Sequence, residues 1–167
     1  MRSTLQRLVL LIILLAGSVL GAAAPAQAKN SQVDGTAFFD SAPGVSCPAP
    51  PPEYDSYPAL VMQGSLEGCW YTHIEQARTT NGNVYLEQGR ELFLGSLNGG
   101  PEGSFTTTYR FEAKLAVDGT EVRGRCQHPI VRGSGIGGSA GATGGLNFKD
   151  IIGEEITYVY RGHISLP

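Results

Sequence analysis

Cys126 and His128 are the two residues of this sequence whose side chains are best suited to acid–base or nucleophilic chemistry. They lie two positions apart on an expected strand, so alternation points both side chains inward. An imidazole moves protons readily near neutral pH, which makes His128 a candidate general acid or base. A thiol nucleophile with an imidazole base is a second interpretation, but residues two apart on a strand lie about 6.6 Å apart at Cα. A hydrogen-bonded core histidine beside Pro129 is the simpler interpretation.

Three glutamates, Glu87, Glu91 and Glu112, could supply a carboxylate that works with His128. A carboxylate inside an apolar barrel would have a raised pKa and could act as an acid. Alternation puts Glu112 on the polar face of its strand, whereas Glu91 turns inward only if Gly89 forms a β-bulge. Solvated positions at the barrel rim are the simpler expectation for glutamates. The candidates for catalysis are therefore His128 and Glu91. No group of residues in the sequence matches a known catalytic motif.

The inward-facing aromatic and polar side chains could form a pocket for a small molecule. The same rings could instead fill the core, since aromatic residues often dominate cores that hold no ligand. If a pocket exists, we expect it to be lined by Trp70, Tyr109, Phe111, Cys126, His128, Phe148, Tyr158 and Tyr160.

No residue pattern indicates a cofactor or a metal ion. Cys126-Gln127-His128 is the one place where two candidate zinc ligands lie close together, and no CxxC motif accompanies it. The run from Gly133 to Gly138 is similar to a nucleotide-binding fingerprint, but neither a helix nor a Gly-Lys-Ser/Thr motif follows it. We therefore expect no bound cofactor and no metal site.

Period-two alternation of apolar and polar residues marks the strands that would hold these side chains. Hairpin signals at Asn81-Gly82 and Asp118-Gly119 join neighbouring strands. The pattern predicts an all-β fold, an antiparallel eight-stranded up-and-down β-barrel, with a β-sandwich as the alternative. The clearest expected strands span residues 66–75, 84–97, 104–117, 120–130, 146–148 and 156–166.

The N-terminus has the order of a secretory signal peptide: two arginines, an apolar core and the small residues Ala26-Gln27-Ala28. We expect cleavage after Ala28, a proline-rich arm over residues 29–58, a barrel domain over residues 59–167, and a secreted, extracellular protein. Loss of Arg2 and Arg7 changes the formal net charge from −3 to −5. This charge argues against a nucleic-acid partner, and we expect no membrane association after cleavage. Self-association remains open.

An exported chain enters an oxidising compartment, and this one carries three cysteines. One disulfide and one free thiol are therefore expected. Strand phase points Cys69 outward, where an arm carrying Cys47 could reach it. This favours a Cys47–Cys69 disulfide with Cys126 buried and reduced. A Cys69–Cys126 disulfide is the alternative and would require both residues to share a face.

Glycine fills seven of the thirteen positions from Gly133 to Gly145, which indicates a tightly packed connection that closes the barrel. Together with Gly103-Ser104-Phe105, Arg110-Phe111-Glu112 and Gly141-Ala142-Thr143-Gly144, this run resembles bacterial secreted members of the allene oxide cyclase and dirigent-like β-barrel superfamily. The resemblance covers residues 60–166. It implies an eight-stranded barrel with an interior pocket, in a group whose plant members handle oxylipins or phenoxy radicals.

The expected function is the binding of a small apolar or aromatic molecule inside the barrel, without covalent chemistry. The alternative is a cofactor-independent isomerase or cyclase that steers a reactive intermediate, with His128 or Glu91 moving protons. A third hypothesis is a purely structural extracellular protein, which would require a barrel packed solid with side chains.

Overall fold

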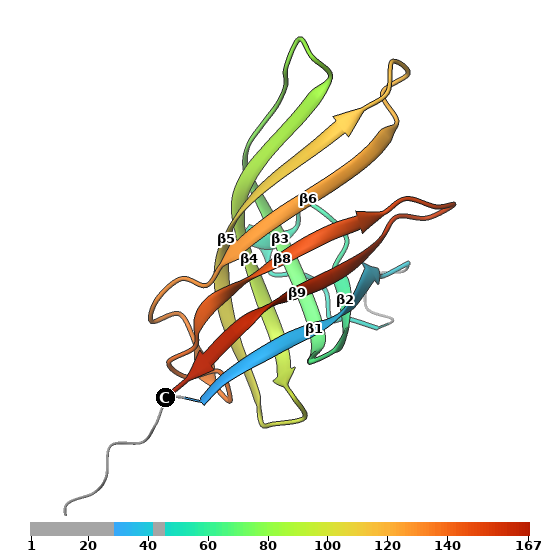
Figure 1. Ribbon diagram of the computed structural model, residues 1–167. Helices are drawn as coiled ribbons and strands as arrows, with labels where there is room; N and C mark the ends of the chain where they lie inside the picture. Colours follow the sequence, from blue (N-terminus) through green and yellow to red (C-terminus); the bar gives the residue numbers. More distant parts are fainter. Residues whose placement is uncertain (1–28, 42–45) are drawn as a thin grey trace, which may run out of the picture.

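The computed structural model describes residues 29–41 and 46–167 of the chain (Figure 1). The expected signal peptide, residues 1–28, lies outside them. Within these ranges the chain is all-β, with one short 3-10 helix, η1 (Pro52–Tyr54), and no α-helix. The strands are β1 (Lys29–Phe39), β2 (Leu60–Gly64), β3 (Leu66–Thr79), β4 (Val84–Leu97), β5 (Glu102–Leu115), β6 (Glu121–Pro129), β7 (Ile136–Gly137), β8 (Thr143–Ile151) and β9 (Thr157–Leu166).

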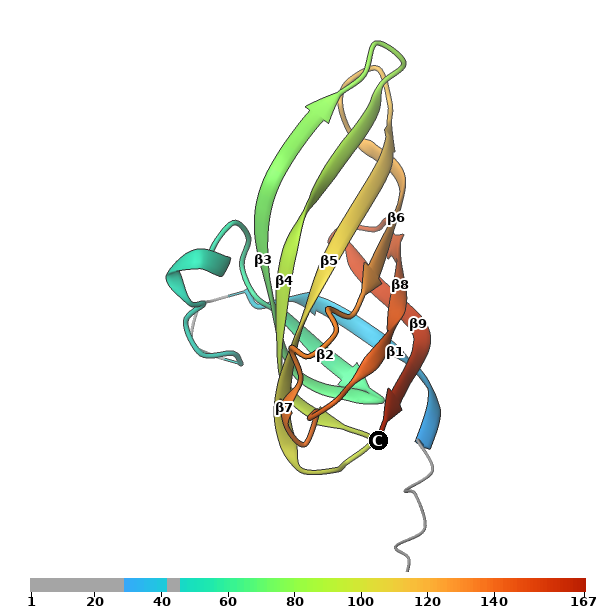
Figure 2. The ribbon, with the colours of Figure 1, turned by 90° about the vertical axis from the view of Figure 1, so that its left-hand side faces the viewer.

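Eight of these strands form a closed barrel, and the two-residue β7 lies outside it, against β5 (Figure 2). Each barrel strand pairs antiparallel with the next one along the chain, and β1 pairs with β9 to close the barrel. The prediction of an eight-stranded up-and-down β-barrel is confirmed, and the β-sandwich alternative is wrong. The described part of the chain has no helix of the length and apolarity that a membrane crossing requires.

The first barrel strand, β1, was not expected from the sequence, which predicted a proline-rich arm over residues 29–58. Residues 29–39 contain no proline, and Val33 and Ala37 are buried on the inner face. The strand can therefore donate its amides to both neighbours, as a closed barrel requires. The barrel begins at residue 29, and the outlying segment is shorter than predicted, running from the end of β1 to the start of β2.

The expected disulfide joins Cys47, in this outlying segment, to Cys69 on the outer face of β3, with 5.7 Å between the Cα atoms. Cys126 is buried as a free thiol, so the alternative Cys69–Cys126 pairing is wrong. Around the disulfide, the segment and β3 form a small second core outside the barrel wall, which includes Tyr54 and Tyr71.

Two β-bulges determine which side chains enter the barrel. The bulge expected at Gly89 lies instead on β3, where Glu75 is the extra residue between Ile74 and Gln76. Gly89 allows the β3 backbone to approach, because an added Cβ there would lie 2.0 Å from the carbonyl oxygen of His73.

A second irregularity lies at the start of β6, where Lys114 pairs with Arg123 and Leu115 pairs with Glu121. Val122 is therefore the extra residue, and it is 56% exposed although the residues that follow it at alternate positions, Gly124 and Cys126, are buried. The bulge turns Glu121 toward the barrel interior instead.

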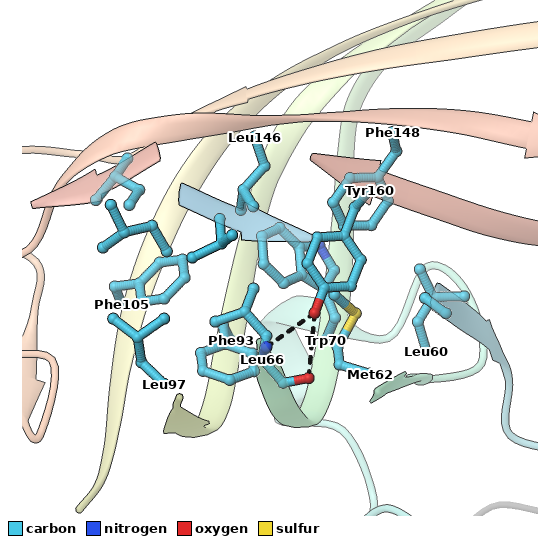
Figure 3. Close-up of a cluster of buried hydrophobic side chains, with 14 of the residues drawn as sticks. Leu60, Met62, Leu66, Trp70, Phe93, Leu97, Phe105, Leu146, Phe148 and Tyr160 are labelled. Atoms are coloured by element: carbon cyan, nitrogen blue, oxygen red, sulfur yellow. Dashed lines mark hydrogen bonds between the residues drawn. The ribbon is translucent and has the colours of Figure 1, made fainter. Parts of the chain in front are cut away.

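One half of the barrel, here called the closed half, is packed solid. Its core residues come from every barrel strand, and Tyr160 links the strands by accepting a hydrogen bond from the Leu66 amide at 2.8 Å (Figure 3). The glycine-rich connection covers this end: Gly138 lies so close to the β4–β5 turn that an added Cβ would meet the carbonyl oxygen of Pro101 at 1.9 Å. The fully buried side chains here include Leu66, Trp70, Phe93, Phe105, Tyr160 and Ile164.

Candidate functional site

The opposite half of the barrel, here called the open half, contains a cavity of about 290 Å³ that is partly open to solvent. It lies at the end that carries the β3–β4, β5–β6 and β8–β9 turns. Seven aromatic side chains line it, together with aliphatic and polar groups, and all eight barrel strands contribute to the lining. The lining residues are Phe39, Tyr57, Leu60, Thr72, Tyr85, Glu87, Glu91, Tyr109, Phe111, Ala113, Leu115, Glu121, Cys126, His128, Phe148, Asp150, Ile156 and Tyr158.

Glu87 accepts hydrogen bonds from three tyrosine hydroxyls, and we call these four residues the Glu87 cluster. Tyr57 donates to Oε2 at 2.7 Å, Tyr85 donates to the same oxygen, and Tyr109 donates to Oε1 at 2.7 Å. Glu87 is only 5% exposed. Burial, and then the nearby Glu87 carboxylate, raise the pKa of all three phenols. The three tyrosines therefore remain protonated and donate to Glu87.

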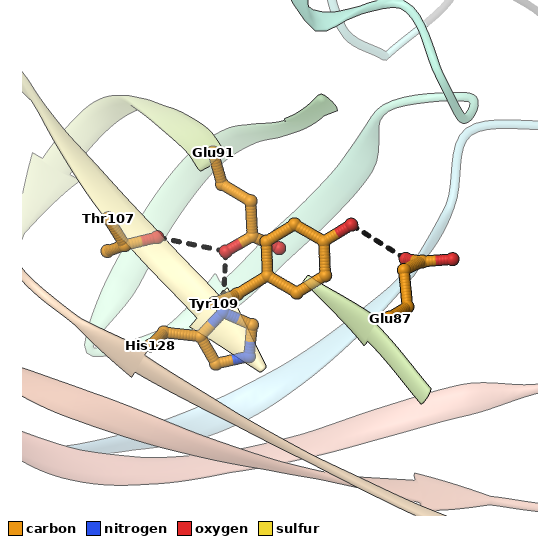
Figure 4. A network of polar contacts seen from close by, with 5 residues as sticks. All are labelled: Glu87, Glu91, Thr107, Tyr109 and His128. Atoms are coloured by element: carbon orange, nitrogen blue, oxygen red, sulfur yellow. Dashed lines mark hydrogen bonds and ion pairs between the residues drawn. The ribbon is translucent and has the colours of Figure 1, made fainter. Parts of the chain in front are cut away.

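Glu91 forms a second buried polar group with Thr107 and His128 (Figure 4). The hydroxyl of Thr107 donates to Glu91 Oε2 at 2.9 Å, and His128 Nδ1 lies 2.5 Å from the same oxygen. The His128 ring packs 4.2 Å from the ring of Phe148, measured between centroids. In the neutral imidazole, donation from Nδ1 to Glu91 makes the second ring nitrogen, Nε2, an acceptor, and Nε2 has no partner among the described residues.

Glu121 and Asp150 form a third group, called here the acid pair. Their carboxyl oxygens converge over Gly124, where an added Cβ would lie 2.2 Å from Asp150 Oδ2 and 2.4 Å from Glu121 Oε1. Burial, followed by hydrogen bonding to Glu121 and its negative charge, raises the pKa of Asp150 to about 8. Asp150 therefore holds its proton at neutral pH.

The structure brings six of the eight expected pocket residues into the cavity wall: Tyr109, Phe111, Cys126, His128, Phe148 and Tyr158. The other two, Trp70 and Tyr160, are 1% exposed and belong to the closed half. Trp70 lies directly beneath the cavity, with its ring 5.5 Å from His128 and 5.3 Å from Phe148 between centroids.

Cys126 lines the cavity but is unsuited to nucleophilic chemistry. Burial and the nearby carboxylates, with Glu91 first among them, raise the pKa of its thiol. The thiol therefore stays protonated, and the interpretation of Cys126 and His128 as nucleophile and base is not supported.

The orientation of the glutamate side chains was predicted less accurately than that of the aromatic side chains. Glu87 and Glu91 are each 5% exposed and face inward, where solvated rim positions were the simpler expectation. Glu112 is exposed as expected and pairs with Arg125 at 3.3 Å. The missed signal lies in β4, where Tyr85, Glu87, Gly89, Glu91 and Phe93 share one face without interruption. Asp150, which lies beyond the strand expected over residues 146–148, is a buried residue of β8.

No family model, curated protein or solved structure matches this chain. The class of protein is therefore defined by its fold and its cavity. It is a closed up-and-down β-barrel with a packed half and a half that contains a cavity. Among the residues that the structure describes, no group of three or more His, Cys, Asp and Glu side chains is arranged to hold a metal ion.

Proposed function

We propose that this protein binds a small molecule with an aromatic or apolar body in the open half of its barrel. The observation that carries the proposal is the cavity itself, which combines aromatic walls with a few convergent polar groups, the usual composition of a small-molecule site. A volume of about 290 Å³ lies at the lower end of the range for ligand pockets and suits a molecule of one or two rings.

The polar groups of the cavity are held in place before any ligand arrives. The three phenols of the Glu87 cluster come from the outlying segment, β4 and β5, so one carboxylate fixes three separate parts of the rim. A rigid, preformed site loses little conformational entropy on binding. A purely structural protein would need no such cavity, so we place that hypothesis last.

Export from the cell is part of the proposal. The signal-peptide pattern over residues 1–28 and the disulfide between Cys47 and Cys69 both support it, because disulfides persist in oxidising compartments. The resemblance to the allene oxide cyclase and dirigent-like barrels supports a function for the pocket. We propose a relationship to that superfamily, and only the glycine and aromatic motifs support it.

A second candidate function is a cofactor-independent isomerase or cyclase, and the contact between Glu91 and His128 favours it. Glu91 orients the imidazole through Nδ1, which leaves Nε2 free to take a proton from a bound molecule and return it at another atom. The aromatic wall would hold the reactive intermediate in one conformation. In this case His128→Gln would abolish turnover while the protein still bound its ligand.

Native mass spectrometry of the secreted protein tests binding. We expect a noncovalent adduct in the intact spectrum that is lost on denaturation. The variant Ala113→Trp should remove the adduct, because Ala113 is a buried residue of the cavity wall and the larger ring would fill the space. Ala142→Ser, in the closed half, is the control and should retain the adduct. Wild-type protein that is empty in every preparation, or an adduct that survives in Ala113→Trp protein of native circular dichroism, would contradict the proposal.

A further inference from the structure

The charged side chains of the cavity are all of one sign. Four carboxyl groups line it, those of Glu87, Glu91, Glu121 and Asp150, and none of the lysines and arginines in the described ranges does. The basic residues next to this region, Arg125 and Lys149, are exposed on the outer surface of β6 and β8. A bound molecule therefore meets negative charge and aromatic faces in the same small space.

Two of the four carboxylates are already occupied by partners within the protein. Glu87 accepts three phenol hydrogen bonds, and Glu91 accepts hydrogen bonds from Thr107 and His128. The acid pair differs, since its two carboxyl groups face each other, and no other described residue donates a hydrogen bond to the buried atoms Glu121 Oε1 and Asp150 Oδ1. Asp150 is 6% exposed, so water at the surface does not compensate for the missing partner.

The chain is built to keep these two carboxyl groups together. The bulge at Val122 turns Glu121 inward, and glycine at position 124 leaves room for both side chains. Two adjacent buried carboxyl groups repel each other when ionised, so the arrangement is costly unless a proton or a cation lies between them.

Aromatic rings surround the acid pair. Tyr158 lies opposite Asp150 in the β8–β9 register, and Phe111 lies opposite Cys126 in the β5–β6 register; both line the cavity. A positive charge next to such rings gains cation–π attraction in addition to its ion pair. A carboxylate and aromatic faces are together the chemistry that recognises an organic ammonium group.

We propose that the ligand of this cavity is an aromatic amine whose ammonium group donates hydrogen bonds to Glu121 and Asp150 while its ring packs against the aromatic wall. The inference rests on the proposed function and specifies its ligand class. Carboxylate ligands such as fatty acids are disfavoured, because they would add negative charge to a cavity without a cationic side chain.

Isothermal titration calorimetry with six matched probes tests the ligand class. The amines are 2-phenylethylamine and tryptamine, the neutral analogues are 2-phenylethanol and tryptophol, and the anions are phenylacetate and indole-3-acetate. We expect each amine to bind at least about tenfold more tightly than its alcohol, because a hydrogen bond to a charged group stabilises more than a neutral one. Each carboxylate should bind most weakly.

The variant Glu121→Gln/Asp150→Asn tests the location. Both changes are needed, because either carboxyl group alone could still accept a hydrogen bond from the ammonium group. The double variant should lose the preference for amines while its affinity for the alcohols stays within about twofold, which also shows that the cavity is intact. Glu112→Gln, an exposed carboxylate on the outer face of β5, is the matched control and should behave as wild type.

The outcomes separate the two proposals. Alcohols that bind as tightly as amines would overturn the amine inference and leave small-molecule binding standing. An amine preference that persists in the double variant would overturn the placement at Glu121 and Asp150. Failure of all six probes to bind wild-type protein at millimolar concentration would count against both the amine inference and the proposed function.

Discussion

Buried carboxylates are rare, because moving an ionised group out of water is costly unless other groups satisfy it. Here Glu87 and Glu91 lie on the same face of β4, and each has its own set of donors. The donors of Glu87 are phenols, which are strong hydrogen-bond donors that stay neutral at physiological pH. At the scale of single residues, these hydrogen bonds are what allow two glutamate side chains to line the cavity.

Glu87→Gln should lower the free energy of unfolding by about 1–3 kcal/mol. The amide nitrogen of glutamine cannot accept a hydrogen bond, so at least one buried phenol of the Glu87 cluster would lose its acceptor. Urea denaturation monitored by circular dichroism measures the change. Glu112→Gln should change stability by no more than about 0.5 kcal/mol. Equal stability of Glu87→Gln and wild-type protein would contradict the assigned contacts.

The raised pKa of Asp150 makes stability depend on pH. Its pKa rises from 3.8 to about 8 on folding, so the folded chain binds the proton more tightly than the unfolded chain. The resulting stabilisation is complete below about pH 4 and is lost progressively as the pH rises to about 8.

Asp150→Asn removes this dependence. If the two proteins are equally stable near pH 5, the variant should be the more stable protein at pH 9, by on the order of a few kcal/mol. Thermal unfolding at four pH values between 5 and 9 measures the difference. A gap between the two melting temperatures that is constant over this range would show that Asp150 does not hold its proton in the folded protein.

At the scale of elements, the strands could be predicted from the sequence and their local irregularities could not. Alternation located β4, β5 and β9 well, because a strand with one wet face needs a strict period of two. The bulges at Glu75 and Val122 were missed, because a bulge depends on the pairing of two strands and leaves little trace in either one alone.

These bulges explain why the candidate site was predicted less completely than the fold. The period-two alternation of the strands identified the aromatic residues that face the interior. Glu121 faces inward because of the bulge at Val122, which regular alternation does not reveal. The Glu87 cluster depends on Tyr57, which belongs to a segment without alternation. A hydrogen-bond partner 30 residues away along the chain cannot be inferred from local pattern.

The outlying segment is fastened to the barrel at the Cys47–Cys69 disulfide, which closes a loop of 22 residues. The variant Cys47→Ser/Cys69→Ser should lose about 3 kcal/mol of stability, chiefly because its unfolded chain is less constrained. Chemical denaturation of the variant and of wild type under non-reducing conditions measures the loss. Thiol labelling of wild type should modify Cys126 alone, and only after unfolding. Labelling of a second cysteine in unfolded, non-reduced protein would contradict the disulfide.

At the scale of the whole molecule, the closed half of the barrel contributes the packed core that stabilises the fold, and the open half contributes the cavity proposed for binding. Large fully buried side chains such as Leu66, Phe93 and Tyr160 fill the closed half, whereas the lining of the open half leaves space. An eight-stranded barrel is just wide enough for either outcome. Closure was predictable from strand number and turn spacing; the cavity was not, because it depends on the summed volumes of side chains from all strands.

The central claim is that a small molecule binds in the open half of the barrel. A titration of ¹⁵N-labelled protein with the six aromatic probes, followed by two-dimensional NMR, tests it most directly. For at least one probe, the account predicts saturable shift changes at cavity residues such as Tyr85, Tyr109 and Phe148, with Leu97 and Ile164 of the closed half unaffected. No saturable shift with any probe, or shifts confined to the closed half and the outer surface, would contradict it.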